Sequence, residues 1–326
     1  MKMLLHPLSA ASFWLTLPAS PSSLGTATAQ SLAKTVPTER TAAYLAERYP
    51  FLPQPYHLLR PAGRRNATEL FHFYSIPATW QDAAFYQIAP GIFAPSPEAT
   101  LVALAKHLSF HELALVGSAF CGNFRIAPLS PFGIEYRHPL TSTADIRTYL
   151  TDHPSAGGSK QLSRALPHFV EGAESPPEIL MAMALALPSK YGGSGLSRLF
   201  SNWTYLPSAK AQAIAGRKML RPDALASANG KLVVIEYDSD AAHLSAQQAK
   251  DDEAKRLALE ADGIKVISIR PGHLKSSSYM ELVALEIYAH LGVRPSAQSA
   301  SYAEQRRKLF QVNRVLDRFV LSSKRC

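Results

Sequence analysis

The sequence predicts an α/β protein whose C-terminal half is built on a mixed sheet flanked by helices. Residues 232–235 are a short, β-branched apolar run after Asn229-Gly230, which is typical of a buried strand entered through a tight turn. Residues 245–262 have a helical pattern that ends before Gly263, and residues 264–269 alternate as a second strand. This order of strand, helix and strand indicates a β-α-β crossover and parallel pairing of the two strands.

The first half predicts a separate α+β part. Residues 1–50 carry two helical patterns around a Ser/Pro/Thr-rich connector at 18–38, and short apolar runs bracket Pro90-Gly91 as a hairpin. Helices are also expected over 97–122 and 143–151. Residues 154–160 are rich in Ser and Gly, which indicates a linker. We therefore predict a first domain over 1–153, a linker over 154–160 and a second domain over 161–298.

The second domain is expected to contain a helix over 176–187, since Ser175-Pro176-Pro177-Glu178 is a strong helix start, and a strand over 203–205. Residues 299–326 predict a basic amphipathic helix. Seven Lys or Arg residues stand there against two acids, and apolar residues recur at helical spacing. We expect the apolar stripe to dock on the protein and the basic face to be free for phosphates, although a solvated face without a partner would have the same pattern.

Bulk composition agrees with a folded protein that binds a polyanion. Hydrophobic residues make up 47% and charged residues 18% of the 326, and the net charge is +9. The charge alone fits equally a basic protein with no such partner. Two distant cysteines predict neither a disulfide framework nor a zinc site, and favour the cytoplasm. No stretch has the length of a membrane span, and Pro7 and Ser9 interrupt the apolar N-terminus, which favours a helix of the folded protein over a signal peptide.

Acidic residues surround the strand predicted at 232–235. Asp223 precedes the turn, and Glu236, Asp238 and Asp240 follow the strand at a spacing of two. If the strand continues, these last three carboxylates share one face and repel one another. A hard divalent cation, a bound proton or a splayed strand end would each relieve that repulsion.

The order of Arg-x-Asp, a turn, an apolar strand ending in Glu-Tyr-Asp-Ser-Asp-x-x-His, a helix and Gly-x-x-Val-Ile-x-Ile resembles the PD-(D/E)XK nuclease superfamily over roughly residues 175–275. More narrowly, it is similar to the bacterial branch related to very-short-patch repair endonucleases. The resemblance implies a restriction-endonuclease-like sheet and Mg²⁺ or Mn²⁺ held by Asp223 and Glu236. Asp238 stands where the superfamily usually has a lysine, so Lys255 or Arg256 of the following helix is expected to reach the site. The catalytic set that it implies is Glu178, Asp223, Glu236, Asp238, His243 and Lys255.

The first half resembles abortive-infection antitoxin-like regulators, through pieces such as His6-Pro7-Leu8-Ser9-Ala10 and Tyr56-His57-Leu58-Leu59. Together the two resemblances imply a metal-dependent DNA endonuclease of repair or defence. The alternatives are a catalytically silent, DNA-binding regulator on a nuclease scaffold, and an interaction module of a toxin–antitoxin pair. The side chains expected to contact nucleic acid are Arg217, Lys218, Arg221, Arg256, Arg306, Arg307 and Lys308.

Overall fold

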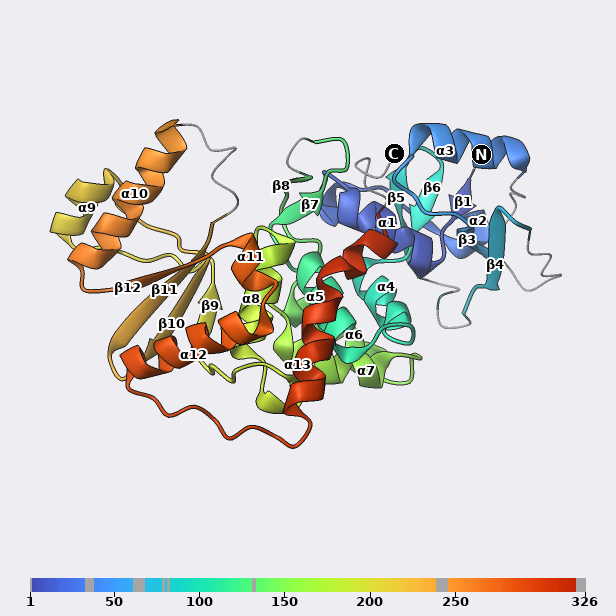
Figure 1. The fold of residues 1–326 in the computed structure, drawn as a ribbon. Coiled ribbons are helices and arrows are strands. Elements are labelled where there is room, and N and C mark those ends of the chain that lie inside the picture. The colour runs from blue at the N-terminus through green and yellow to red at the C-terminus, as the bar shows by residue number, and fades with distance from the viewer. Residues whose placement is uncertain are drawn as a thin grey trace. The chain divides into compact units, whose positions relative to one another are not determined.

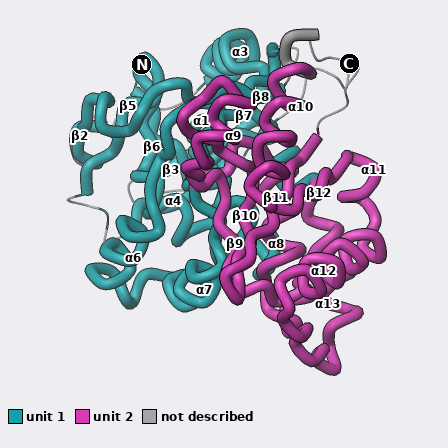
Figure 2. The backbone as a smooth tube through the Cα atoms, turned by 90° about the vertical axis from the view of Figure 1, so that its left-hand side faces the viewer, with its two compact units in different colours: residues 1–171, 314–326 teal, residues 172–313 magenta. Residues whose placement is uncertain are grey.

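The computed structural model describes residues 2–32, 38–60, 68–77, 80, 83–130, 133–238 and 246–320. It has the predicted mixed α/β character, with helices around several sheets (Figure 1). The chain divides into two compact units: unit 1 holds residues 1–171 and 314–326, and unit 2 holds residues 172–313 (Figure 2). The division falls at Gly172, so the stretch predicted as a linker, 154–160, lies inside unit 1.

Unit 1 contains three sheets. Strands β1 (Met3–Leu4), β2 (Thr26–Thr28), β5 (Ala84–Ala89) and β6 (Ile92–Ala94) form a sheet of order β1-β6-β5-β2. Strands β3 (Tyr56–Arg60) and β4 (Phe71–Ser75) pair in parallel, and β7 (Phe124–Ile126) pairs antiparallel with β8 (Ile134–Tyr136). The helices are α1 (Pro7–Thr16), α2 (Ala29–Leu32), α3 (Glu39–Arg48), α4 (Pro97–Leu104), α5 (Phe110–Phe120), α6 (Thr143–Asp152) and α7 (Ser159–Ala165).

The predicted hairpin around Pro90-Gly91 is confirmed, because β5 and β6 pair antiparallel on either side of it. Residues 97–122 are helical as predicted, but they form two helices, since α4 ends at Leu104 and α5 begins at Phe110. The local reason is a capping box: the Ser109 hydroxyl accepts from the Glu112 N–H, and the Ser109 N–H donates to the Glu112 carboxylate. That pair satisfies the first backbone donors of a new helix.

Unit 2 is built on one four-stranded sheet of order β12-β11-β10-β9. Strands β9 (Leu199–Ser201), β10 (Ala224–Ala228) and β11 (Lys231–Tyr237) are antiparallel neighbours, and β12 (Lys265–Ile269) runs parallel to β11. Helix α10 (Ala246–Ala261) lies between β11 and β12 in the chain, so the predicted crossover is confirmed. The other helices are α8 (Pro176–Ala186), α9 (Ala209–Ala215), α11 (Pro271–Leu274), α12 (Ser277–Leu291) and α13 (Tyr302–Gln311).

The β10–β11 hairpin turns at Asn229 and Gly230, which both have positive φ (50° and 71°), as a two-residue turn of this kind requires. Figure 1 shows α9 and α10 on one side of the sheet and α12 on the other. Leu225 and Val234 point to the α9 and α10 side, where they pack with Leu259 in one apolar cluster. Residues two positions away on the same strands share that side.

The strand predicted over 203–205 is wrong, because β9 ends earlier, at Ser201. Asn202 has a left-handed φ of 49°, which takes the chain out of the sheet. Tyr205 makes only an isolated bridge, to Leu220.

The C-terminal segment is α13 followed by a 3₁₀ helix at Val312–Arg318, rather than one continuous helix. Its apolar stripe is buried as predicted, at Leu309, Val312, Leu316, Phe319 and Val320. Arg306 is also buried, since its guanidinium donates to the carbonyls of Gly192 and Ser277. Among the described residues, no helix combines the length and apolarity that crossing a membrane would require.

Candidate active site

Two carboxylates face each other at the open end of the β10–β11 hairpin. Ala224 pairs with Ile235 in the antiparallel register, so the next positions outward, Asp223 and Glu236, lie opposite one another. Both are two residues from positions that pack against the helices, which places them on the α10 side of the sheet. Side chains opposite one another in this way have Cβ atoms roughly 5 Å apart. The turn at 229–230 and the strand register thus bring together two acids that are thirteen positions apart.

Asp223 is held in place by one hydrogen bond to its side chain and one to its backbone carbonyl. Its Oδ2 accepts from the Tyr237 N–H at 2.7 Å, and its carbonyl accepts from the Asn202 N–H at 2.9 Å. Burial raises the pKa of this carboxyl to about 8, with further contributions from the negative charges of Glu236 and Glu178. Near neutral pH, when no metal ion is bound, this carboxyl therefore retains a proton for much of the time.

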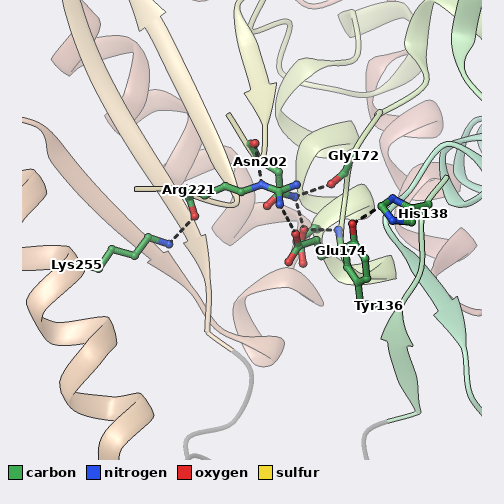
Figure 3. A network of polar contacts seen from close by, with 8 residues as sticks. Tyr136, His138, Gly172, Glu174, Asn202, Arg221 and Lys255 are labelled. Atoms are coloured by element: carbon green, nitrogen blue, oxygen red, sulfur yellow. Dashed lines mark hydrogen bonds and ion pairs between the residues drawn. The ribbon is translucent and has the colours of Figure 1, made fainter. Parts of the chain in front are cut away.

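Lys255 reaches Glu236 from α10. Its Nζ lies 2.8 Å from Oε1 and 2.9 Å from Oε2, and it hydrogen-bonds to Oε2. The same ammonium donates to the carbonyl of Arg221 at 2.9 Å (Figure 3). Lys255 is placed there because Leu259, four residues later on the same side of α10, packs in the apolar cluster against the sheet. The ammonium beside Glu236 therefore comes from the helix that follows the strand.

The Glu236 carboxylate is only partly satisfied. Among the described residues, its Oε1 is buried without a hydrogen-bond partner, although Lys255 Nζ is close enough for a charge interaction. Burial raises the pKa of Glu236, and the effect of Lys255 in the opposite direction is smaller. A buried carboxylate oxygen without a donor is a favourable position for a cation.

A pocket of about 380 Å³ lies over these side chains. Asp238, at the end of β11, lies beside it and is exposed, and its N–H donates to the Ile269 carbonyl. Five acids but only two bases line the pocket, so its charge favours a cation over a bare phosphate. The charged lining residues are Asp223, Glu236, Asp238, Asp252, Glu253, Lys255 and Arg256.

Glu178, predicted as a further catalytic acid, has a different environment. It lies in the first turn of α8, is 7% exposed, and does not line the pocket. Its carboxylate accepts from the Glu174 N–H, the Ser175 hydroxyl and the Asn202 side-chain amide, at 2.7 to 3.0 Å. Glu178 is thus connected to Asp223 through Asn202, whose backbone N–H donates to the Asp223 carbonyl. Sequence reasoning missed Asn202, because only its left-handed backbone brings it between these two acids.

Of the remaining predicted residues, Arg256 lines the pocket and the others are dispersed. Arg217 pairs with Asp251, Arg221 with Glu174, Arg256 with Glu260 and Lys308 with Glu304, all as partly exposed ion pairs. Lys218 and Arg307 are exposed, whereas Arg306 is buried in structural hydrogen bonds and is not available to a phosphate. His243 and Asp240 lie outside the described residues.

The site suits a hard divalent cation that needs few protein ligands. Across the described ranges, no group of three or more His, Cys, Asp or Glu side chains is arranged to hold a metal ion. Mg²⁺ commonly needs only one or two carboxylates and keeps several waters. Asp223 and Glu236 meet that requirement: both offer carboxylate oxygens, both have raised pKa values, and both line the pocket.

Comparison with known proteins adds no relative. No protein-family model, no curated protein and no solved structure matches this chain.

Proposed function

We propose that unit 2 is a metal-dependent nuclease domain, similar to the PD-(D/E)XK superfamily, that hydrolyses phosphodiester bonds of DNA. The observation that supports the proposal is the convergence of Asp223 and Glu236 from one hairpin and Lys255 from α10 on one pocket. Two carboxylates with an ammonium alongside are the groups that hydrolysis of a phosphodiester needs.

Mg²⁺ or Mn²⁺, held by Asp223 and Glu236, would neutralise phosphate charge and lower the pKa of a bound water. Without a cation, the five acids of the pocket repel a phosphate, so substrate binding in the pocket depends on the metal. Asp223 retains its proton until that charge is supplied, because its pKa is raised to about 8. Metal binding therefore converts the pair from a partly protonated to a fully ionised state.

Lys255 takes the role for which Asp238 is unsuited. Its ammonium is anchored by Glu236 and the Arg221 carbonyl, which fixes its position at the pocket wall. A fixed positive charge at this place stabilises negative charge that develops on an attacking water or on the phosphate. Asp238, as an exposed carboxylate at the pocket edge, adds to the charge that attracts the metal.

The test is cleavage of supercoiled and single-stranded DNA by the purified full chain, with Mg²⁺ or Mn²⁺ and with EDTA. Asp223→Asn and Glu236→Gln should slow metal-dependent nicking by about 100- to 1000-fold, and Lys255→Met should slow it about 10- to 100-fold. Glu304→Gln is the matched control, because Glu304 is an exposed acid outside the pocket. Nicking that persists at the wild-type rate in Asp223→Asn would exclude this site as its source.

One contact favours a second function, a catalytically silent DNA-binding regulator. The Lys255 ammonium lies against both oxygens of Glu236, and such an ion pair competes with a metal for this carboxylate. In that case, the protein should bind DNA with an affinity that falls steeply as salt rises, and should cut under no divalent-metal condition. The same assay distinguishes the two functions.

A further inference from the structure

Two large aromatic rings are exposed at the edge of the unit 2 sheet. Phe200, in β9, is 40% exposed, and Trp203, just after it, is 53% exposed. Their ring centroids lie 5.2 Å apart with the planes at 47°. The other two tryptophans, Trp14 and Trp80, are 0% and 7% exposed. Exposed aromatic surface of this size is costly in water and commonly marks a binding surface.

The aromatic pair belongs to the same side of the sheet as the acids. Phe200 pairs with Leu225, which in turn pairs with Val234, and both partners face α9 and α10. Phe200 therefore lies two strands across and two residues along from Glu236, about 12 Å by strand geometry. Three or four stacked nucleotides, at roughly 3.4 Å each, cover that distance.

Arg221 connects the two places. Its carbonyl accepts from Lys255 at the pocket, and its side-chain Nε donates to the carbonyl of Asn202, the residue before Trp203 (Figure 3). Its guanidinium also pairs with Glu174 at 3.0 Å, with both side chains more than 40% exposed. Such an exposed pair is weak and can exchange for a phosphate.

The segment of the chain that carries the rings is basic, which suits a polyanion. From residue 179 to residue 222 the chain has six Lys or Arg residues and no Asp or Glu. Arg198, Lys210, Lys218 and Arg221 are exposed. The pocket, in contrast, is lined mostly by acids. Phosphates of a nucleic acid are therefore favoured beside the basic segment, and a cation is favoured in the pocket.

We propose that Phe200 and Trp203 are a stacking platform for unpaired bases of a single-stranded nucleic acid, whose phosphates contact Arg198 and Arg221. The proposal deepens the nuclease function and rests on it for its biological purpose, because the platform would lead a single strand toward the pocket. Aromatic rings beside basic side chains are the usual means of binding single strands without sequence preference. In a duplex the faces of the internal bases are covered by their neighbours, so the platform selects unpaired bases.

The experiment follows Trp203 fluorescence as the full chain is titrated with a short oligothymidylate, an oligouridylate or a blunt duplex, in low salt with EDTA. Trp203 is the exposed tryptophan, so stacking on it should quench emission with either single strand. Trp203→Ala should weaken single-strand binding by about 5- to 150-fold, the equivalent of about 1–3 kcal/mol per stacked base, and duplex binding by less than about 2-fold. Trp203→Phe should restore most of the affinity.

The control is Leu282→Ala, because Leu282 is a large apolar side chain on α12 that is 64% exposed. Emission that stays unchanged at saturation, or an equal loss of duplex binding in Trp203→Ala, overturns the platform. Because EDTA removes divalent metal, binding is measured without metal-dependent cleavage, and the two proposals are tested separately. Quenching without any metal-dependent cleavage supports the platform and excludes the nuclease. If the protein cleaves DNA and the Trp203→Ala variant binds single strands as tightly as the wild type, the nuclease proposal is supported and the platform is excluded.

Discussion

Unit 2 buries carboxylates in two places, and the two are built in opposite ways. Glu178 accepts three hydrogen bonds and does not line the pocket over Asp223 and Glu236. Glu236 has a single side-chain partner among the described residues, the Lys255 ammonium, and lines a pocket opposite a second acid. A satisfied buried carboxylate holds structure together, whereas a half-satisfied pair stores repulsion that a cation can relieve. The difference indicates which of the predicted acids would act on a substrate and which would position it.

The largest expected effect is on cleavage. Glu236→Gln should lower the metal-dependent rate by about 100- to 1000-fold, because it removes a charge at the reacting centre. Glu178→Gln should lower it by about 10-fold or less, since the amide oxygen can still accept the hydrogen bonds from the Glu174 N–H and the Asn202 side chain. Single-turnover kinetics at saturating metal measures both. Equal losses in the two variants would remove the distinction between an acting and a positioning acid.

Stability should show the reverse order. Glu178→Ala should destabilise the protein by about 3 kcal/mol, because three donors lose their acceptor in a buried place. Glu174→Ala is the matched control, an acid at 43% exposure whose loss should cost less than about 0.5 kcal/mol. Urea denaturation reports the free energy of unfolding of each. A Glu178→Ala variant as stable as the control would mean that these hydrogen bonds contribute nothing.

Asp223→Asn should stabilise the metal-free protein increasingly as the pH rises toward 8. Folding raises the pKa of Asp223 from its ordinary 3.8 to about 8, so the folded state holds the proton more tightly. The cost of ionising this carboxyl is absent below about pH 4, grows as the pH rises to about 8, and is constant above. Thermal melts in EDTA across this window should show the advantage of Asp223→Asn growing with pH. Asp317→Asn, at an exposed acid, should show none.

The smallest expected effect is on metal affinity. Metal binding should displace the proton of Asp223, so affinity for Mn²⁺ should rise by up to about tenfold per pH unit toward pH 8 and level off above. Calorimetric titration of the wild type and of Asp223→Asn measures this slope, which the variant should lack. A flat profile in the wild type would indicate that the pair binds the metal without releasing a proton.

The sequence predicted the parts of the site that depend on local pattern. The turn at Asn229-Gly230 and the β-branched run after it determine the hairpin register, and with it the meeting of Asp223 and Glu236. Lys255 was anticipated as one of two candidates, and the burial of Leu259 selects it over Arg256, which pairs with Glu260 instead. Both outcomes follow from spacing along one strand or one helix.

Long-range contacts were not predictable in this way. Asn202 reaches Glu178 because its backbone is left-handed, a conformation that one residue type permits but does not require. Arg306 was assigned to a basic face, yet it turns inward to the carbonyls of Gly192 and Ser277, which lie far away in sequence. Helical periodicity shows which side of α13 is apolar. It does not show which charged side chain completes the hydrogen bonds of a neighbouring loop.

The lysine and the two carboxylates are carried by separate elements, α10 and the β10–β11 hairpin. A hairpin formed alone therefore holds two repelling acids with no compensating ammonium. The Lys255 ammonium reaches the pocket only when α10 has packed against the sheet. A shift of α10 along its axis would alter the Lys255–Glu236 contact before it disturbed the strands. The position of this one helix therefore determines the charge of the whole pocket.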